Sequence, residues 1–174
     1  VSLIVSAFAP VRDVRRTLTP QLVRDAGPTV LLLIDLGAGR DRLGGSRLAQ
    51  VYGRLGGAVP DVDDPARLSG LFAVVRELAR EGRVLAYHDR SDGGLAVAAL
   101  EMAFAGRLGV ELELAPEAAP VPALYSEELG ALLQLREADV PAALAACARH
   151  GLGGLARVVG RVVAAPHFAV RQGN

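Results

Sequence analysis

The stretch LAYHDRSDGGLAVAALEMAFAG, residues 85–106, changes character twice. An apolar run ends at His88, a group of polar residues and two glycines follows, and an Ala/Leu-rich segment then begins. A strand that runs into a polar turn and continues as a helix is typical of this order of residue types. The polar group needs an explanation, because 51% of the chain is hydrophobic. Its members are His88, Asp89, Arg90, Ser91 and Asp92, followed by Gly93 and Gly94.

The polar group lies where ligands gather in layered sheets, beyond the carboxyl end of a strand. The N-terminus of the following helix offers N–H groups and the positive end of a dipole, and both favour an anion such as phosphate. Gly93 and Gly94 allow the backbone to approach a ligand closely. In this interpretation Asp89 holds Mg²⁺, which usually takes only one or two protein carboxylates, and Ser91 donates a hydrogen bond to a phosphate.

A purely structural interpretation stays open beside this one. Asp and Ser are among the commonest N-cap residues, so Asp92 or Ser91 can cap the helix that follows. His88 can be a core or loop histidine that is bonded to the backbone. The spacing alone does not decide between a cap and a ligand site, because one short cluster is a weak pattern.

Strands and helices alternate along the rest of the chain. TVLLLIDLG (29–37) is a continuous apolar run, typical of a strand that is buried on both faces. DVDDPARLSGLFAVVRELAREGR (61–83) is the clearest helix, with Asp63 or Asp64 as its cap and Pro65 in its first turn. Further strands are expected at 3–9, 83–88, 109–114, 130–136 and 155–163, and further helices at 46–56, 94–106 and 137–151. Interleaved strands and helices predict α/β or α+β layers, and we expect an α+β fold with a mixed sheet layered with helices.

A second glycine-rich turn, GAGRDRLGGS (37–46), precedes another predicted helix. Gly44, Gly45 and Ser46 are a weaker candidate for a phosphate cradle. The turn lacks the lysine of a P-loop, and it departs from G-x-G-x-x-G because Arg42 stands where the third glycine should be. Plain turn chemistry is therefore the alternative at this position.

Two further features have a structural interpretation. Glu127 and Glu128 are adjacent carboxylates, but neighbours on a strand point to opposite faces, so a joint acid–base role is not expected. Cys147 stands in the Ala-rich run ALAACARH and is expected to be a small buried side chain. With one Cys in the chain, neither an intrachain disulfide nor a Cys-based zinc site is expected.

The composition excludes several classes of protein. Basic and acidic residues number 19 each, so no excess of positive charge indicates a nucleic-acid partner. All the Lys+Arg residues are Arg, which excludes a P-loop lysine and a Schiff-base lysine in this chain. No apolar run is long enough for a membrane span, and the opening VSLIVSAFAPVRDVRR is a poor signal peptide. We expect a single domain, residues 1–174, excised from a longer cytoplasmic protein.

Five segments together resemble the large, single-chain family of phosphoribosylformylglycinamidine synthases (formylglycinamidine ribonucleotide synthetases). The most specific part is YHDRSDGG with EMAFAG behind it. The resemblance covers nearly the whole chain. The five segments are SLIVSAFAPVRDVRRTLTPQL, LLLIDLG, LGGSRLAQVYGRLG, LAYHDRSDGGLAVAALEMAFAG and YSEELGALLQ.

The resemblance implies an α+β fold like the C-terminal domain of aminoimidazole ribonucleotide synthetase, here the C-terminal part of the second of two such halves. It implies an enzyme of purine biosynthesis that uses ATP, Mg²⁺ and glutamine to convert formylglycinamide ribonucleotide to the amidine. It also implies that Asp89 binds magnesium and that Ser91 contacts a nucleotide, ATP or ADP, at an auxiliary and structural site.

The resemblance implies two partners within the same enzyme. A preceding sheet domain carries the other magnesium ligands, and a C-terminal glutaminase domain carries its own catalytic Cys and His. Nothing around Cys147 resembles the glutaminase motif. We therefore expect no catalytic residue in this chain, no nucleic-acid or membrane partner, and no turnover by the chain alone.

Overall fold

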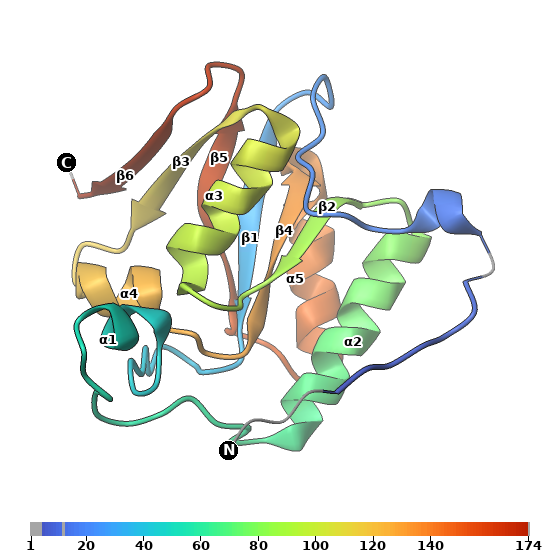
Figure 1. The fold of residues 1–174 in the computed structure, drawn as a ribbon. Helices are drawn as coiled ribbons and strands as arrows, with labels where there is room; N and C mark the ends of the chain where they lie inside the picture. Colours follow the sequence, from blue (N-terminus) through green and yellow to red (C-terminus); the bar gives the residue numbers. More distant parts are fainter. Residues whose placement is uncertain (1–4, 12, 174) are drawn as a thin grey trace.

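The computed structural model describes residues 5–11 and 13–173, and a six-stranded sheet lies at its centre (Figure 1). The spatial order of the strands is β2-β4-β1-β5-β3-β6, and all neighbouring pairs are antiparallel except the parallel pair β3 and β6. This mixed sheet confirms the predicted α+β class. The strands are β1 (Thr29–Asp35), β2 (Val84–Asp89), β3 (Gly109–Leu114), β4 (Gly130–Arg136), β5 (Ala156–Val163) and β6 (Phe168–Gln172).

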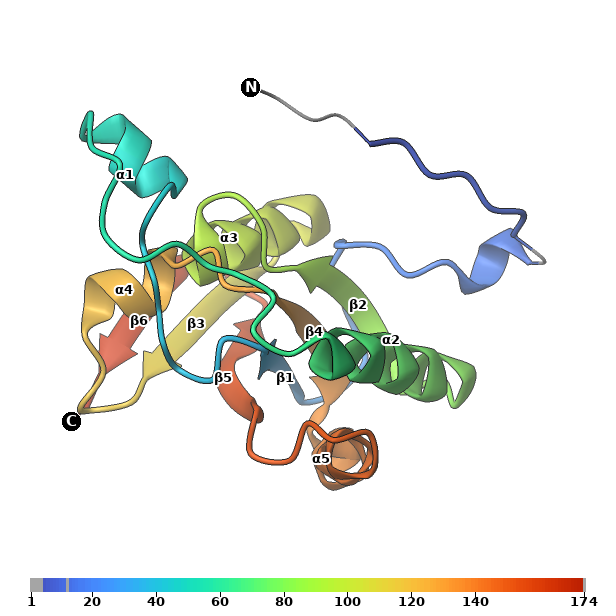
Figure 2. The same cartoon turned by 90° about the horizontal axis from the view of Figure 1, so that it is seen from below.

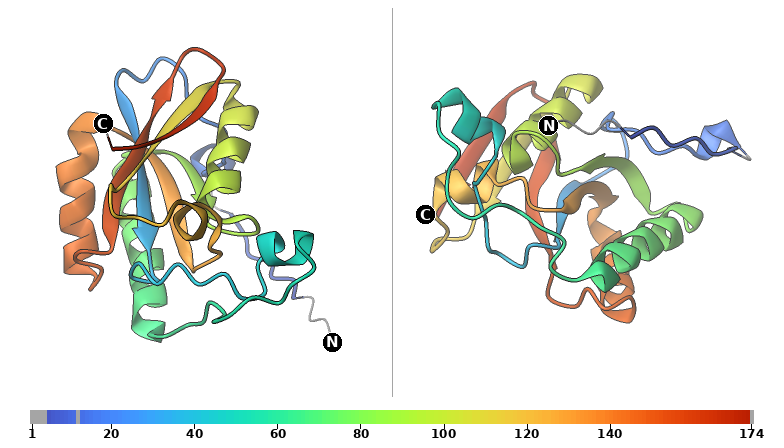
Figure 3. Two further views of the ribbon diagram at one scale, coloured as in Figure 1. Left: turned by 90° about the vertical axis from the view of Figure 1, so that its left-hand side faces the viewer. Right: turned by 60° about the horizontal axis from the view of Figure 1, so that its bottom comes forward.

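Helices pack on both faces of the sheet (Figures 2 and 3). Helices α2 and α5 lie together on one face, and α3 lies on the other with the short α4 beside it. Within the described residues no helix is long and apolar enough to cross a membrane. The helices are α1 (Arg47–Val51), α2 (Pro65–Arg80), α3 (Gly94–Gly106), α4 (Pro120–Tyr125) and α5 (Val140–Arg149), with 3₁₀ turns η1 (Val14–Arg16) and η2 (Glu137–Asp139).

Strand β1 joins the two layers of the core. Leu32 and Ile34 face α2 and α5, whereas Leu31 and Leu33 face α3, and all four are fully buried. Side chains on a strand alternate between faces, so a strand with apolar residues at every position must be covered on both sides. The prediction of a strand buried on both faces is therefore confirmed. Cys147 is buried in the first of these cores, as expected.

The N-terminal strand expected at 3–9 is wrong for the residues that can be judged. Residues 5–9 form no strand and are exposed, and residues 1–4 lie outside the described residues. Figure 2 shows this segment running away from the body of the molecule. An apolar run indicates a strand only if a neighbouring strand can pair with it, and no strand of this sheet does so.

Two helix ends differ from the sequence expectation. The helix expected at 46–56 shortens to α1, because Gly53 and Gly56 adopt left-handed φ values of 64° and 79°. Helix α3 has the predicted bounds, but the left-handed residue at its end is Arg107, with φ 51°, and not Gly106. A Cβ on Gly106 would lie 2.7 Å from the Cβ of Leu22, so this glycine permits close packing.

Candidate functional site

The polar group of residues 88–92 begins in the last two residues of β2 and ends just before α3, at the predicted junction of strand and helix. Its strand pairing ends where Asp89 faces Ala131 of β4. Successive side chains then point in opposite directions: the side chain of Asp89 is 66% exposed, whereas that of Arg90 is 1% exposed. The group therefore divides into residues that face solvent and one arginine that faces the interior.

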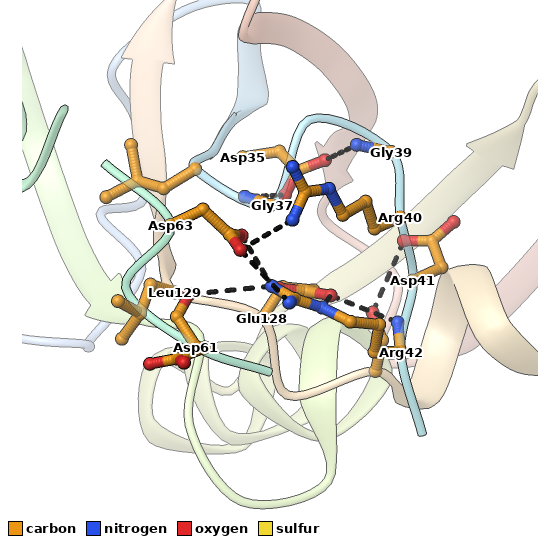
Figure 4. Close-up of polar contacts among 12 residues, drawn as sticks. Asp35, Gly37, Gly39, Arg40, Asp41, Arg42, Asp61, Asp63, Glu128 and Leu129 are labelled. Carbon is orange, nitrogen blue, oxygen red and sulfur yellow. Dashed lines mark hydrogen bonds and ion pairs between the residues drawn. The ribbon is translucent and has the colours of Figure 1, made fainter. Parts of the chain in front are cut away.

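Arg90 forms a buried ion pair with Asp35, the last residue of β1. The two side chains are 1% and 2% exposed, and a terminal nitrogen of Arg90 lies 2.5 Å from Asp35 Oδ1. Asp35 also accepts the backbone N–H groups of Gly37 and Gly39, at 3.0 and 2.8 Å (Figure 4). Arg90 Nε donates to the carbonyl of Glu128 at 2.7 Å. These bonds compensate both buried charges and join the ends of β1, β2 and β4.

A second network fixes the loop that follows β1. The side chain of Glu128 is 1% exposed and accepts both Nε and a terminal nitrogen of Arg42, at 2.6 and 2.7 Å. Asp63 bridges Arg42 and Arg40, at 2.8 and 2.5 Å (Figure 4). The hydrogen bonds from Arg42 and then from Arg40 hold the pKa of Asp63 below its usual range. This network was not expected, because Arg42 carried no motif in the sequence.

His88 lies near the end of β2, beside α3. Its Nδ1 is 2.7 Å from the carbonyl oxygen of Asp89, and its Nε2 is 2.8 Å from Oε2 of Glu101. A carbonyl oxygen and a carboxylate oxygen both accept hydrogen bonds, so each ring nitrogen of His88 faces an acceptor. The expectation of a histidine bonded to the backbone is confirmed, and Glu101 is a partner that the sequence did not reveal.

The start of α3 corrects the capping alternative. Its N-cap residue is Gly93, with φ 82°, and the cap has no side-chain hydrogen bond. Asp92 instead forms an exposed ion pair with Arg47 of α1, at 2.7 Å. The N–H of Gly93 donates to Oε1 of Glu127 at 2.8 Å. Neither Asp92 nor Ser91 therefore caps α3 with its side chain.

Gly94 has a steric reason to be glycine. Its φ is 69°, and a Cβ at this position would lie 2.6 Å from the carbonyl oxygen of Ser126 and 2.8 Å from that of Leu124. Both contacts are to rigid backbone. The first turn of α3 therefore packs directly against the end of α4, and no side chain fits between them.

The second glycine-rich turn has the contacts of an ordinary turn. The N–H groups of Gly44 and Gly45 donate to carbonyls of Ala58 and Leu55 within the same loop, at 2.8 and 2.7 Å. Ser46 caps α1. Because these groups already have partners, the geometry favours turn chemistry over a phosphate cradle.

Asp89 and Ser91 remain the predicted ligand residues. Asp89 is exposed and Ser91 is half-buried one residue beyond the buried Arg90. Within the described part of the chain, no group of three or more His, Cys, Asp or Glu residues could hold a metal ion. Asp89 can thus supply one carboxylate to Mg²⁺, and the other oxygen ligands must come from phosphate, water or another domain.

A family model described as "AIR synthase related protein, C-terminal domain" matches residues 26–173. Among solved structures, phosphoribosylformylglycinamidine synthase II from Thermotoga maritima is similar with a TM-score of 0.69 and 20% identity, over 92% of this chain and 26% of that chain. The T. maritima PurL complexed with ATP gives 0.69 and 19%, over 91% and 25%. HypE, a hydrogenase maturation protein of E. coli, gives 0.60 and 19%, over 88% and 49%. At these identities the likeness shows the fold alone, and the chain spans a quarter to a half of those proteins.

Proposed function

The chain belongs to the family of C-terminal domains of AIR synthase related proteins, and on that premise we propose that it is one domain of a longer ATP-dependent enzyme. The enzyme we propose is a phosphoribosylformylglycinamidine synthase of the large, single-chain type. It converts formylglycinamide ribonucleotide to the amidine in purine biosynthesis, with glutamine as the nitrogen source. The observation that carries this proposal is the stretch YHDRSDGG, placed between β2 and α3 with Asp89 exposed at the strand end.

The solved relatives support the choice of substrates. T. maritima PurL has been solved in complexes with ATP, with ADP and with FGAR. The similarity to E. coli HypE shows that this fold also occurs in a hydrogenase maturation protein. The YHDRSDGG resemblance is what favours the purine enzyme over other members of the fold.

In the proposed site Asp89 binds Mg²⁺ and Ser91 contacts a phosphate of ATP or ADP. When bound, Mg²⁺ neutralises phosphate charge and orients the phosphate oxygens. The buried pair of Arg90 with Asp35 holds the backbone on which both ligand residues stand. The role of this chain is therefore to bind and orient a nucleotide, and we propose no catalytic residue in it.

We propose that the remaining parts of the site lie in other domains of the same cytoplasmic enzyme. A preceding sheet domain supplies further magnesium ligands, and a C-terminal glutaminase domain supplies ammonia. Phosphoryl transfer needs several fixed groups around the phosphates. Residues 1–174 alone therefore should not turn over ATP.

A purely structural docking domain is the second candidate. It is favoured by the partners that the polar group already has: Arg90 pairs with Asp35, and Asp92 pairs with Arg47. In that case the stretch only shapes the junction of β2 and α3. Asp89 distinguishes the two candidates, since its carboxylate is 66% exposed and lies 3.7 Å from Nδ1 of His88, which is too far for a hydrogen bond.

The test is nucleotide binding by the longer enzyme with Asp89→Asn. We expect the affinity for ADP in the presence of Mg²⁺ to fall about tenfold or more, and binding without Mg²⁺ to change little, because one metal ligand is lost. Asp25→Asn is the matched control, since Asp25 is exposed and outside the site. Unchanged magnesium-dependent binding, together with a lower melting temperature, would show that Asp89 is a structural residue.

A further inference from the structure

Residues 43–60 form a loop that is closed mainly on itself. Hydrogen bonds from Gly44 to Ala58 and from Gly45 to Leu55 join its two arms. Residues 51–59 are all exposed, including Tyr52. An open apolar groove of about 520 Å³ is lined by residues of the loop and by Val121 of α4. The loop, which contains α1, is therefore a compact unit that packs loosely on the domain; we call residues 43–60 the flap.

Arg47 connects the flap to the rest of the domain by polar contacts. Among the described residues, the hydrogen bonds and ion pairs that leave the flap all come from Arg47. Its guanidinium pairs with Asp92, and its backbone N–H donates to Oε1 of Glu127 at 2.8 Å. The same oxygen accepts the N–H of Gly93 at 2.8 Å. One carboxylate oxygen thus bridges the first residue of α1 and the N-cap of α3.

The adjacent glutamate holds the base of the flap in a different way. Glu128 is buried and accepts two side-chain hydrogen bonds from Arg42, the residue just before the flap. Glu127 is half-buried and reaches the flap at Arg47. A buried, charge-compensated contact resists opening far more than one that solvent can reach. The contact of Glu128 with Arg42 therefore resists opening, and the contact of Glu127 with Arg47 opens more easily.

We propose that Glu127 is a latch, a positioning residue that holds the flap against the loop of residues 89–93. Release of Glu127 from Arg47 lets the flap swing about its base at Arg42. The contacts of Arg47 with Asp92 and Glu127 hold the flap beside Asp89 and Ser91. Opening of the flap would therefore change the access of a nucleotide to these two residues. This consequence rests on the proposed function, whereas the latch itself does not.

The first experiment compares Arg47→Pro with Arg47→Ala by amide hydrogen exchange, without nucleotide. Both variants remove the pair with Asp92, but only proline also removes the N–H that binds Glu127. Proline suits the first residue of a helix, and the preceding Ser46 is already extended, with φ −65° and ψ 160°. We expect exchange in the flap to be about tenfold faster in Arg47→Pro than in Arg47→Ala, the effect of one charge-assisted hydrogen bond. Equal exchange in the two variants would overturn the proposal.

The second experiment removes the latch from the other side, with Glu127→Ala. Flap exchange should again rise about tenfold, while the amides of β1 and β4 keep their protection. Glu117→Ala is the control, because Glu117 is exposed in the loop before α4. If Glu127→Ala raises exchange in β1 and β4 as much as in the flap, Glu127 supports the whole domain and is not a latch. Since no nucleotide is present, these outcomes do not depend on whether Asp89 binds a metal.

Discussion

At the residue scale, the polar group of the opening stretch contains two kinds of side chain with opposite tasks. The sequence could indicate that ligands gather after a strand end, but not which polar residue would face inward. Arg90 faces inward because side chains alternate between the two faces along β2 and the residue that follows it, and because its buried partner Asp35 lies at the end of β1. An aspartate inside the run LLLIDLG was the available signal, since a carboxylate in a buried strand needs a partner.

Arg90→Ala should be among the most destabilising single changes in the chain. It leaves the charge of Asp35 buried without its guanidinium, and removal of one member of a buried pair costs about 3–5 kcal/mol. The check is urea unfolding followed by far-UV circular dichroism. Arg67→Ala is a suitable comparison, because Arg67 donates to a carbonyl, that of Leu36, and its ion pair is half-exposed. A similar loss in the two variants would mean that the buried pair contributes little.

Asp92→Ala should have a small effect on stability, which distinguishes the observed cap from the one that the sequence suggested. A lost side-chain cap would cost about 1 kcal/mol. Loss of an exposed ion pair with Arg47 should cost about 0.5 kcal/mol or less, and less still at high salt. Thermal melting at low and high salt measures this difference. A salt-independent loss near 1 kcal/mol would restore Asp92 as the cap.

At the element scale, the sequence predicted strands and helices well where the period was strong and the ends were marked. Helix α3 has the predicted bounds, and α2 begins after its Asp64 cap with Pro65 in its first turn. The prediction missed β6 and α4, because both are short and carry no clear period. The paired strand β6 exists through its parallel register with β3, a long-range contact that no local pattern reveals.

The junction of α3 and α4 predicts a large effect for Gly94→Ala. A methyl group here meets backbone oxygen at 2.6 Å, in addition to the strain of φ 69°. We expect a loss of more than about 2 kcal/mol, since strain at positive φ alone costs about 1–2 kcal/mol. Gly45→Ala is the control, with φ 70° and open space around the added methyl group. Equal losses in urea unfolding would show that strain, and not contact with α4, explains the glycine.

At the scale of the whole molecule, the sequence indicated the α+β class and the place of the ligand loop, but not how the loop is supported. The supports are contacts between residues far apart in the chain: Arg90 with Asp35, Arg42 with Glu128, and Glu127 with Gly93. A single sequence can indicate that Asp35 needs a partner, but it carries no signal for which residue that partner is. It could predict which residues are chemically able to bind a ligand, and the fold then decides which of them are already engaged.

The two cores should unfold together, because β1 contributes to both through alternate residues. Met102 of α3 is fully buried on one face, and Met102→Ala should cost about 2–5 kcal/mol. Cys147 lies in the core on the other face, where burial raises the pKa of its thiol to about 11. At pH 8 the folded chain should therefore react slowly with a thiol reagent, and labelling should follow opening of that core.

If the sheet unfolds as one unit, Met102→Ala should speed labelling of Cys147 by the factor that its loss in unfolding free energy predicts. Leu100→Ala is the control, since Leu100 lies on the same helix but is half exposed. Labelling in urea should also share its midpoint with the loss of far-UV signal. A Met102→Ala variant with reduced stability but an unchanged labelling rate would mean that the face with α2 and α5 opens without the face with α3. The shared strand β1 argues against that result, because α2 and α5 cannot lose Leu32 and Ile34 as partners while Leu31 and Leu33 stay packed on α3.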